Sequence, residues 1–200
     1  MTKYMTNFDD LKIVNVRSDI AKLLHKMKAK TICEIGVRDG EHLQALLIKG
    51  ITQAVAVDIW KDTGVVSQND ECSAQLALDE QYQIVLNMAE KDKRINVIKD
   101  FSVNASKQFP DEYFDFVYID ADHTEEAVKE DILAWWPKVR SGGVLAGHDY
   151  SPAIITFKDN YVLKFGVIEA VNKFVANNKL ALHTDSDVPP GDRSWFIVKS

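Results

Sequence analysis

An α/β fold with a mostly parallel sheet and helices on both of its faces is the architecture that this sequence predicts. Short apolar runs, typical of strands, alternate along the 200 residues with segments whose apolar residues recur at helical spacing. Acidic residues follow these runs at five strand ends: Glu34, Asp58, Asp100, Asp120 and the pair His148–Asp149. Ligands bind beyond the carboxyl ends of parallel strands, so we expect these side chains to meet in one site. Helix capping explains any one of these acids but not all five.

One domain spans residues 1–200, with an N-terminal helical segment at residues 1–29 and a core at residues 30–200. The first helix is predicted by helical spacing of Val16, Ile20, Leu23, Leu24 and Met27. The expected strands are residues 31–35, 54–58, 95–98, 114–119, 144–147, 181–183 and 195–198. Helices are expected after Gly40, from Ser73 to Ala89, from Ser102 to Phe109, around 125–136 and at 166–176.

Capping and turn residues set the boundaries of these elements. Gly50 ends the helix that follows Gly40, and Ser73 and Ser102 are candidate N-caps. Pro137 halts the next helix, and a turn at residues 141–143 introduces the fifth strand. The last helix stops at residues 177–178, and a turn at residues 189–191 separates the final strands. We expect the polar loop 59–72 and the stretch 151–163 to form the lid of the pocket.

The turn Glu34-Ile-Gly-Val-Arg-Asp-Gly40 follows the first strand and opens a helix. Gly36 and Gly40 allow a sharp turn and, by this interpretation, leave room for a ligand that a Cβ would occupy. The spacing differs from the G-x-G-x-x-G of dinucleotide binders, and Glu34 would repel a pyrophosphate. A cofactor with a cationic end suits this carboxylate, and S-adenosylmethionine is one. Glycine turns are also common as plain loop punctuation.

Two further strand ends carry candidate cofactor contacts. Asp58 ends the second strand, where an acid can accept hydrogen bonds from both ribose hydroxyls. Asp100 can accept from an adenine amino group, while the neighbouring Phe101 covers the ring face. Trp60 either flanks a ligand or packs at the rim of the sheet.

The segment after the fourth strand carries the expected chemistry. Asp120 and His123 lie across a strand-to-helix turn, so both can face one pocket, with His123 as a proton acceptor near the helix start. His123 has an alternative role as a helix cap, and Asp122 fits a capping or surface position better than a ligand role. Asp120, His148 and Asp149 offer oxygen and imidazole ligands suited to Mg²⁺ or another divalent ion.

The remaining histidines, His25, His42 and His183, are expected to lack acidic partners and are interpreted as surface or helix-face residues. The Trp135–Trp136 pair fits either the core or an interface between copies, which leaves a homo-oligomer open. Cys33 and Cys72 lack the spacing of a metal or redox motif and are expected to be reduced thiols.

The net charge of −6 disfavours nucleic acid or an anionic membrane surface as a partner. No apolar run approaches the roughly 18 residues of a membrane span, and the first residues lack the apolar region of a signal peptide. We therefore expect a cytoplasmic protein whose partner is a small-molecule acceptor.

The sequence resembles the class I S-adenosylmethionine-dependent methyltransferases. It is most similar to the small-molecule O-methyltransferases of the catechol and macrolide-sugar types, which include methyltransferase domain 24. The resemblance covers nearly the whole chain from Glu34-Ile-Gly onward, and its most specific parts are residues 115–123 and Gly142-Gly-Val-Leu-Ala-Gly-His-Asp-Tyr150. It implies a Rossmann-like, seven-stranded sheet with an antiparallel last strand.

The resemblance also implies cofactor contacts at Glu34, Gly36, Asp58 and Asp100. It implies that His123 is the base, as in the sugar-modifying relatives, and that Asp120 and the His148–Asp149 pair hold the metal. His148 departs from the family, whose metal-dependent members carry a carboxylate there. The expected activity is methyl transfer from S-adenosylmethionine to a hydroxyl of a small polar molecule, with Asp120 also lining the cofactor site. A nicotinamide-dependent oxidoreductase and a non-catalytic cofactor-binding scaffold are the alternatives.

Overall fold

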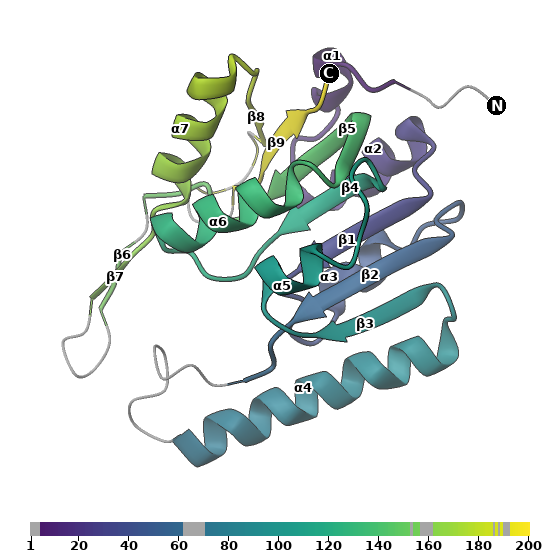
Figure 1. Cartoon of the computed structure of the whole chain (residues 1–200), viewed down its shortest axis with the longest axis vertical. Helices are drawn as coiled ribbons and strands as arrows, with labels where there is room; N and C mark the ends of the chain where they lie inside the picture. The colour runs from purple at the N-terminus through teal and green to yellow at the C-terminus, as the bar shows by residue number, and fades with distance from the viewer. Residues whose placement is uncertain are drawn as a thin grey trace.

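A sheet of seven strands runs through the computed structural model, in the order β3-β2-β1-β4-β5-β9-β8 over the residues that the structure describes (Figure 1). These residues are 5–61, 71–152, 154–156, 162–185, 187, 189 and 193–200. Neighbouring strands from β3 to β5 are parallel, whereas β9 is antiparallel to both β5 and β8. The predicted fold class, including the antiparallel strand near the chain end, is confirmed.

The strands of this sheet are β1 Thr31–Ile35, β2 Gln53–Asp58, β3 Ile95–Lys99, β4 Phe114–Ile119, β5 Val139–Gly147, β8 His183–Thr184 and β9 Trp195–Val198. A separate antiparallel pair, β6 Ile154–Thr156 and β7 Val162–Lys164, occupies part of the stretch predicted as a lid. The rest of that stretch, residues 153 and 157–161, lies outside the described residues. So do residues 62–70 of the other predicted lid loop and parts of the turn at 189–191.

The helices are α1 Phe8–Leu11, the 3₁₀ turn η1 Arg17–Asp19, α2 Ile20–Met27, α3 Glu41–Leu46, α4 Glu71–Lys91, α5 Ser102–Ser106, α6 Glu125–Trp135 and α7 Val167–Asn178. They cover both faces of the sheet (Figure 1). One core cluster packs α1 to α4 on strand residues such as Ile32, Ala54 and Tyr118. The other packs α5 to α7 on their neighbours Cys33, Val55 and Val117. The alternation of strand side chains therefore supplies both cores.

Several predicted boundaries were wrong. The helix after Gly40 ends at Leu46 and not at Gly50, the helix from Ser102 ends at Ser106 and not at Phe109, and the strand expected at 181–183 is His183–Thr184. Ser73 is not an N-cap, because α4 already begins at Glu71. Ser102 is the first residue of α5 rather than its cap, and its hydroxyl accepts a hydrogen bond from Nε1 of the buried Trp135 at 2.8 Å. Residues 141–143 lie inside β5, where Gly142 adopts φ +69° beside a register shift, so these glycines form a β-bulge and not a turn before the strand.

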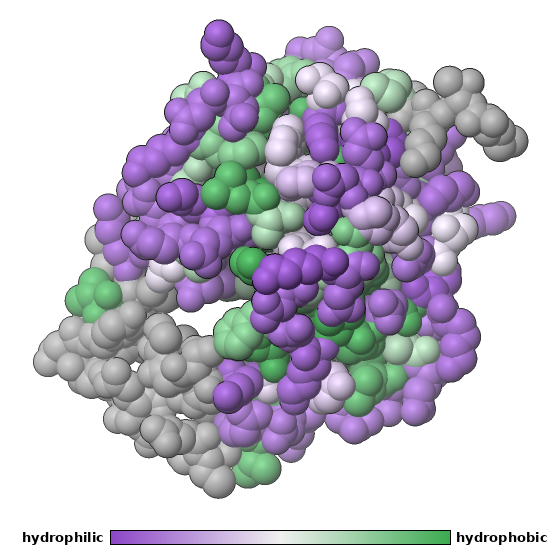
Figure 2. Space-filling model, viewed as in Figure 1, coloured by the Kyte–Doolittle hydropathy of each residue, from purple (hydrophilic) through white to green (hydrophobic). Residues whose placement is uncertain are grey.

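Hydrophilic residues cover most of the face shown in Figure 2, and hydrophobic residues appear on it in small groups. Among the described residues, the search for a helix with the length and hydropathy of a membrane span found none.

Candidate active site

The acidic strand ends line one cavity of about 1730 Å³, together with His123, His148 and residues of η1, α3 and α6. Ligand pockets of roughly 300–1,000 Å³ hold single drug-sized molecules. The cavity therefore has room for a cofactor and a small second substrate. The expected convergence at the carboxyl edge of the sheet is observed for Glu34, Asp58, Asp100, Asp120 and Asp149.

Glu34 is buried near the end of β1 and is paired with a histidine. Its Oε1 lies 2.7 Å from Nδ1 of His42, in the first turn of α3. Burial raises the pKa of Glu34 well above its usual range, and burial followed by the charge of Arg17 lowers the pKa of His42 to about 3. Both shifts favour the neutral form of the group. The prediction that His42 has no acidic partner was wrong, because the short turn after β1 places the start of α3 beside Glu34.

Oε2 of Glu34 has no hydrogen-bond partner among the described residues, and neither has Nε2 of His42, although both atoms are buried. An unpaired buried carboxyl oxygen is costly and usually marks the place of a missing partner. A cationic group in the cavity would supply that partner and restore the charge of the carboxylate.

Gly36 and Gly40 are required by contacts within the protein. Both have φ near +82°, and a Cβ on Gly36 would lie 1.9 Å from the backbone oxygen of Asp120. A Cβ on Gly40 would lie 2.8 Å from Sδ of Met88. The glycines thus let this loop pack against the end of β4 and against α4. Gly36 lines the cavity, whereas Gly40 is not among its lining residues.

Asp58, at the end of β2, is oriented by its own loop. Its Oδ2 accepts the backbone N–H of Arg38 at 2.9 Å, and its Oδ1 accepts that of Trp60 at 2.8 Å. The Trp60 side chain is buried and packs against Tyr82, with ring centroids 4.8 Å apart and the ring planes tilted by 38°. Of the two interpretations of Trp60, packing at the rim of the sheet is therefore the one observed.

Asp100, Phe101 and Asp131 line the next part of the cavity. Oδ1 of Asp100 accepts the backbone N–H of Phe101 at 2.7 Å, and the Phe101 ring is 57% exposed, so it is free to cover a flat ligand. Asp131, on α6, was not singled out from the sequence. Burial raises the pKa of Asp131 to about 6, and this effect outweighs a hydrogen bond with Ser102 that lowers the pKa.

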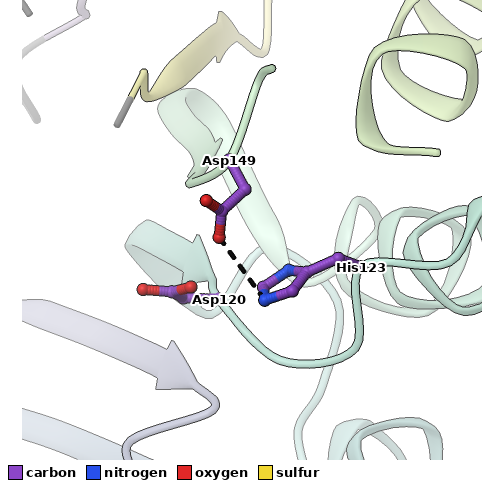
Figure 3. Close-up of side chains that lie close together, drawn as sticks. All are labelled: Asp120, His123 and Asp149. Atoms are coloured by element: carbon purple, nitrogen blue, oxygen red, sulfur yellow. Dashed lines mark ion pairs between the residues drawn. The ribbon is translucent and has the colours of Figure 1, made fainter. Parts of the chain in front are cut away.

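Asp120, His123 and Asp149 converge in the cavity (Figure 3). Nε2 of His123 lies 3.4 Å from Oδ2 of Asp149, and one ligand atom from each residue lies within 4.8 Å of the others. His123 precedes Thr124, whose side chain caps α6 by accepting from the N–H of Ala127. His123 is therefore not the cap of this helix, which leaves its imidazole available to the cavity.

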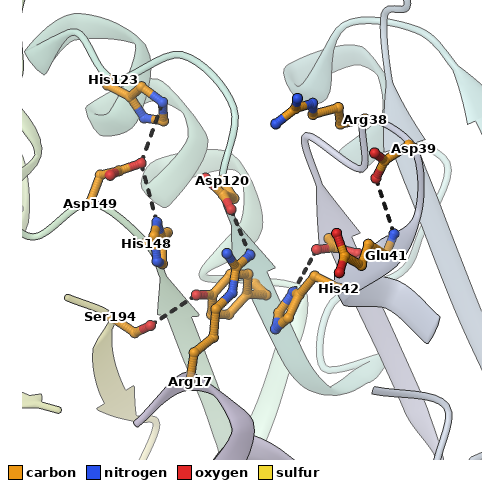
Figure 4. A network of polar contacts seen from close by, with 12 residues as sticks. Arg17, Arg38, Asp39, Glu41, His42, Asp120, His123, His148, Asp149 and Ser194 are labelled. Carbon is orange, nitrogen blue, oxygen red and sulfur yellow. Dashed lines mark hydrogen bonds and ion pairs between the residues drawn. The ribbon is translucent and has the colours of Figure 1, made fainter. Parts of the chain in front are cut away.

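His148 lies on the other side of Asp149, with Nδ1 3.3 Å from Oδ2 of that residue (Figure 4). Burial lowers the pKa of His148, but its hydrogen bond with Asp149 and the charge of Asp120 outweigh burial and raise it. Among the described residues, the group that could hold a metal ion contains His123 and not His148. Asp149 has φ +54°, and the candidate group differs from the predicted ligand set by one residue, with His123 in the place of His148.

Arg17 reaches the cavity from η1 and was not predicted from the sequence. Its Nη2 donates to Oδ2 of Asp120 at 2.7 Å, and its guanidinium carbon lies 5.2 Å from the ring centroid of Tyr118. The Tyr118 hydroxyl is hydrogen-bonded at 2.9 Å to the hydroxyl of Ser194, the residue before β9 (Figure 4). Asp120 thus pairs with Arg17, and Asp149 contacts both His123 and His148.

A family model described as a methyltransferase domain matches residues 33–150, from β1 through β5. The chain belongs to the methyltransferase-domain family. The match spans every strand end that lines the cavity and confirms the resemblance to class I S-adenosylmethionine-dependent methyltransferases. A search of curated proteins gave no match.

Solved structures share the fold of this methyltransferase domain. An O-methyltransferase from Bacillus cereus in complex with SAH has a TM-score of 0.57 at 16% identity, covering 92% of this chain and 80% of that one. The 1,6-didemethyltoxoflavin-N1-methyltransferase of Burkholderia thailandensis, with SAH and 1,6-didemethyltoxoflavin bound, has a TM-score of 0.57 at 11% identity, with coverages of 90% and 74%.

A spermidine synthase from Thermotoga maritima has a TM-score of 0.54 at 15% identity, and the alignment covers 95% of this chain. This chain spans only 58% of the length of that synthase. At these identities the likeness is one of fold.

Proposed function

We propose that this protein transfers a methyl group from S-adenosylmethionine to a hydroxyl of a small polar molecule. The observation that carries the proposal is the His123–Asp149 contact beside Asp120, in the same cavity as the acids predicted to bind the cofactor. Family membership supports the methyl transfer. The hydroxyl acceptor is supported by the imidazole, since removing a hydroxyl proton needs a base within reach of the oxygen.

The cavity fits S-adenosylmethionine on three counts. The unpaired Oε2 of Glu34 offers an acceptor to a cationic group. The carboxylate of Asp58, at the end of β2, is fixed because each of its oxygens accepts a backbone N–H group. The exposed ring of Phe101 is available to an adenine. In this proposal S-adenosylmethionine supplies the methyl group from its sulfonium and leaves as SAH.

The residues of the chain have two tasks in this reaction. They hold the acceptor oxygen in line with the methyl carbon, and they remove the hydroxyl proton, which His123 accepts as the oxygen attacks. Asp149 orients the imidazole and stabilises the imidazolium that forms, since its Oδ2 lies 3.4 Å from Nε2. His148 contacts the same carboxylate oxygen of Asp149, with its Nδ1 at 3.3 Å.

A divalent ion is a further part of the proposal. Asp120, His123 and Asp149 fit such an ion because they offer two carboxylates and an imidazole within 4.8 Å of one another. When bound there, the ion would lower the pKa of the acceptor hydroxyl. His123 could not then be both ligand and base through the same nitrogen, so chelation separates the two mechanisms.

Isotope labelling tests the proposed reaction. The protein is incubated with S-adenosylmethionine carrying a deuterated methyl group and a small-molecule extract, with and without EDTA, and products are analysed by fragmentation mass spectrometry. We expect the label on oxygen. Label on nitrogen or carbon, or no labelled product, would contradict the hydroxyl acceptor. Activity lost in EDTA and restored by Mg²⁺ or Mn²⁺ would assign the oxygen's activation to the ion.

A further inference from the structure

The Asp120 carboxylate already has a cationic partner inside the protein. Nη2 of Arg17 lies 2.7 Å from its Oδ2, and the two side chains are 33% and 19% exposed. Charge-assisted hydrogen bonds of this length between partly buried groups are among the stronger polar contacts in proteins. The cation that occupies Asp120 in this structure is therefore a guanidinium.

The position of Arg17 is fixed by the segment that carries it. The Asp19 carboxylate accepts the backbone N–H groups of Asn15 and Val16 at 3.2 and 3.3 Å, which closes the turn around Arg17. The guanidinium also lies over the Tyr118 ring, 5.2 Å from its centroid. Its Nε is buried and has no hydrogen-bond partner among the described residues, so only part of its donor capacity is used.

A metal ion bound by Asp120, His123 and Asp149 would have to draw these residues together. Mg²⁺ binds oxygen at about 2.1 Å, so two of its ligands lie at most about 4.2 Å apart. The ligand atoms of the three residues lie within 4.8 Å, so modest movement of side chains suffices. Asp120 is the member of this group that Arg17 holds.

We infer that the Arg17 guanidinium and a divalent cation compete for the Asp120 carboxylate, so that Arg17 sets the metal affinity of this site. The inference deepens the metal part of the proposed function. It rests on the proposed ligand group and not on methyl transfer. Removing the guanidinium should free Asp120 and tighten metal binding, whatever the acceptor is.

Mn²⁺ binding to the protein without cofactor tests this competition, followed through the electron paramagnetic resonance signal of free Mn²⁺. Arg17→Gln removes the cation, and Arg17→Met does so while keeping an apolar contact with Tyr118. Arg38→Gln is the matched control, because Arg38 also lines the cavity but lies apart from Arg17 across it (Figure 4). Thermal melts check that each variant is folded.

We expect both Arg17 variants to bind Mn²⁺ about 10- to 100-fold more tightly than the wild type, the range expected from breaking a hydrogen bond to a charged group. Arg38→Gln should stay within about twofold, because exposed charges without direct contact are screened. The gain should vanish when Asp149→Asn is added to Arg17→Gln.

Unchanged or weaker Mn²⁺ binding in the two Arg17 variants would overturn the inference. An equal gain in Arg38→Gln would also overturn it, because the effect would then be one of overall charge. Titration with S-adenosylmethionine remains an independent measure, so failure here is distinguishable from failure of the proposed function.

Discussion

Two residue pairs in the cavity join a histidine to a carboxyl group, and they are suited to different tasks. Glu34 is buried and His42 is half-buried, their side chains lie 2.7 Å apart, and their pKa values are displaced toward the neutral forms. His123 and Asp149 are partly exposed at a longer separation of 3.4 Å. The first pair suits cofactor binding and the second suits proton transfer.

At the residue scale, His42→Phe should weaken S-adenosylmethionine binding by about tenfold or more, because Glu34 loses the partner that fixes its carboxyl group. His42→Asn keeps a side-chain N–H near the position of Nδ1 and should recover part of the affinity. Calorimetric titration of the three proteins gives the comparison. Equal affinity in His42→Phe and the wild type would mean that Glu34 needs no support from α3.

A second residue-scale prediction concerns the base. His123→Ala should lower turnover by roughly 10²–10⁴-fold, the usual contribution of general-base catalysis, while cofactor affinity stays unchanged. Steady-state kinetics and calorimetry on the same preparation separate the two quantities. Near-normal turnover with a divalent ion present would show that the ion alone activates the oxygen.

At the scale of elements, α6 carries a buried carboxyl group whose pKa is about 6. A raised pKa means that the folded state binds more protons than the unfolded state between about pH 4 and 6, so stability falls as pH rises through this window and the cost persists above it. Asp131→Asn removes that cost while its amide oxygen can still accept from Ser102.

Urea unfolding at pH 4 and pH 7.5 measures this effect. Relative to the wild type, Asp131→Asn should gain more stability at pH 7.5 than at pH 4. A displacement of about two pKa units, at about 1.4 kcal/mol each, sets an upper limit of about 3 kcal/mol on the difference. The same free-energy difference at both pH values would show that Asp131 titrates normally.

Element boundaries also show what local sequence can and cannot predict. The strands β1, β2 and β4 lie within a residue of their expected ranges, because their apolar runs are bounded by acids and turns. The glycines of β5 were interpreted as a turn, since a bulge depends on register with β4 and that register is not local. The η1 turn likewise depends on the Asp19 side chain.

At the scale of the whole molecule, the strand-end acids were predictable because a parallel sheet places its carboxyl ends together. Arg17 was not, since the segment before the core reaches the site only through the packing of α1 and α2. His42 was missed because its partner Glu34 lies on a different element, although the intervening turn is short. The metal group differed by one residue because the ligand atoms that lie within 4.8 Å of one another belong to Asp120, His123 and Asp149, and His123 comes from the loop before α6.

The central claim, that this cavity binds S-adenosylmethionine through its strand-end acids, is tested most directly by calorimetric titration of the wild type and of Asp58→Ala. We expect the wild type to bind S-adenosylmethionine and SAH but not NAD. Asp58→Ala should bind S-adenosylmethionine at least about tenfold more weakly, since each lost hydrogen bond to a charged acceptor costs about 1.5–3 kcal/mol. Wild-type affinity in the variant, or tight NAD binding by the wild type, would contradict it.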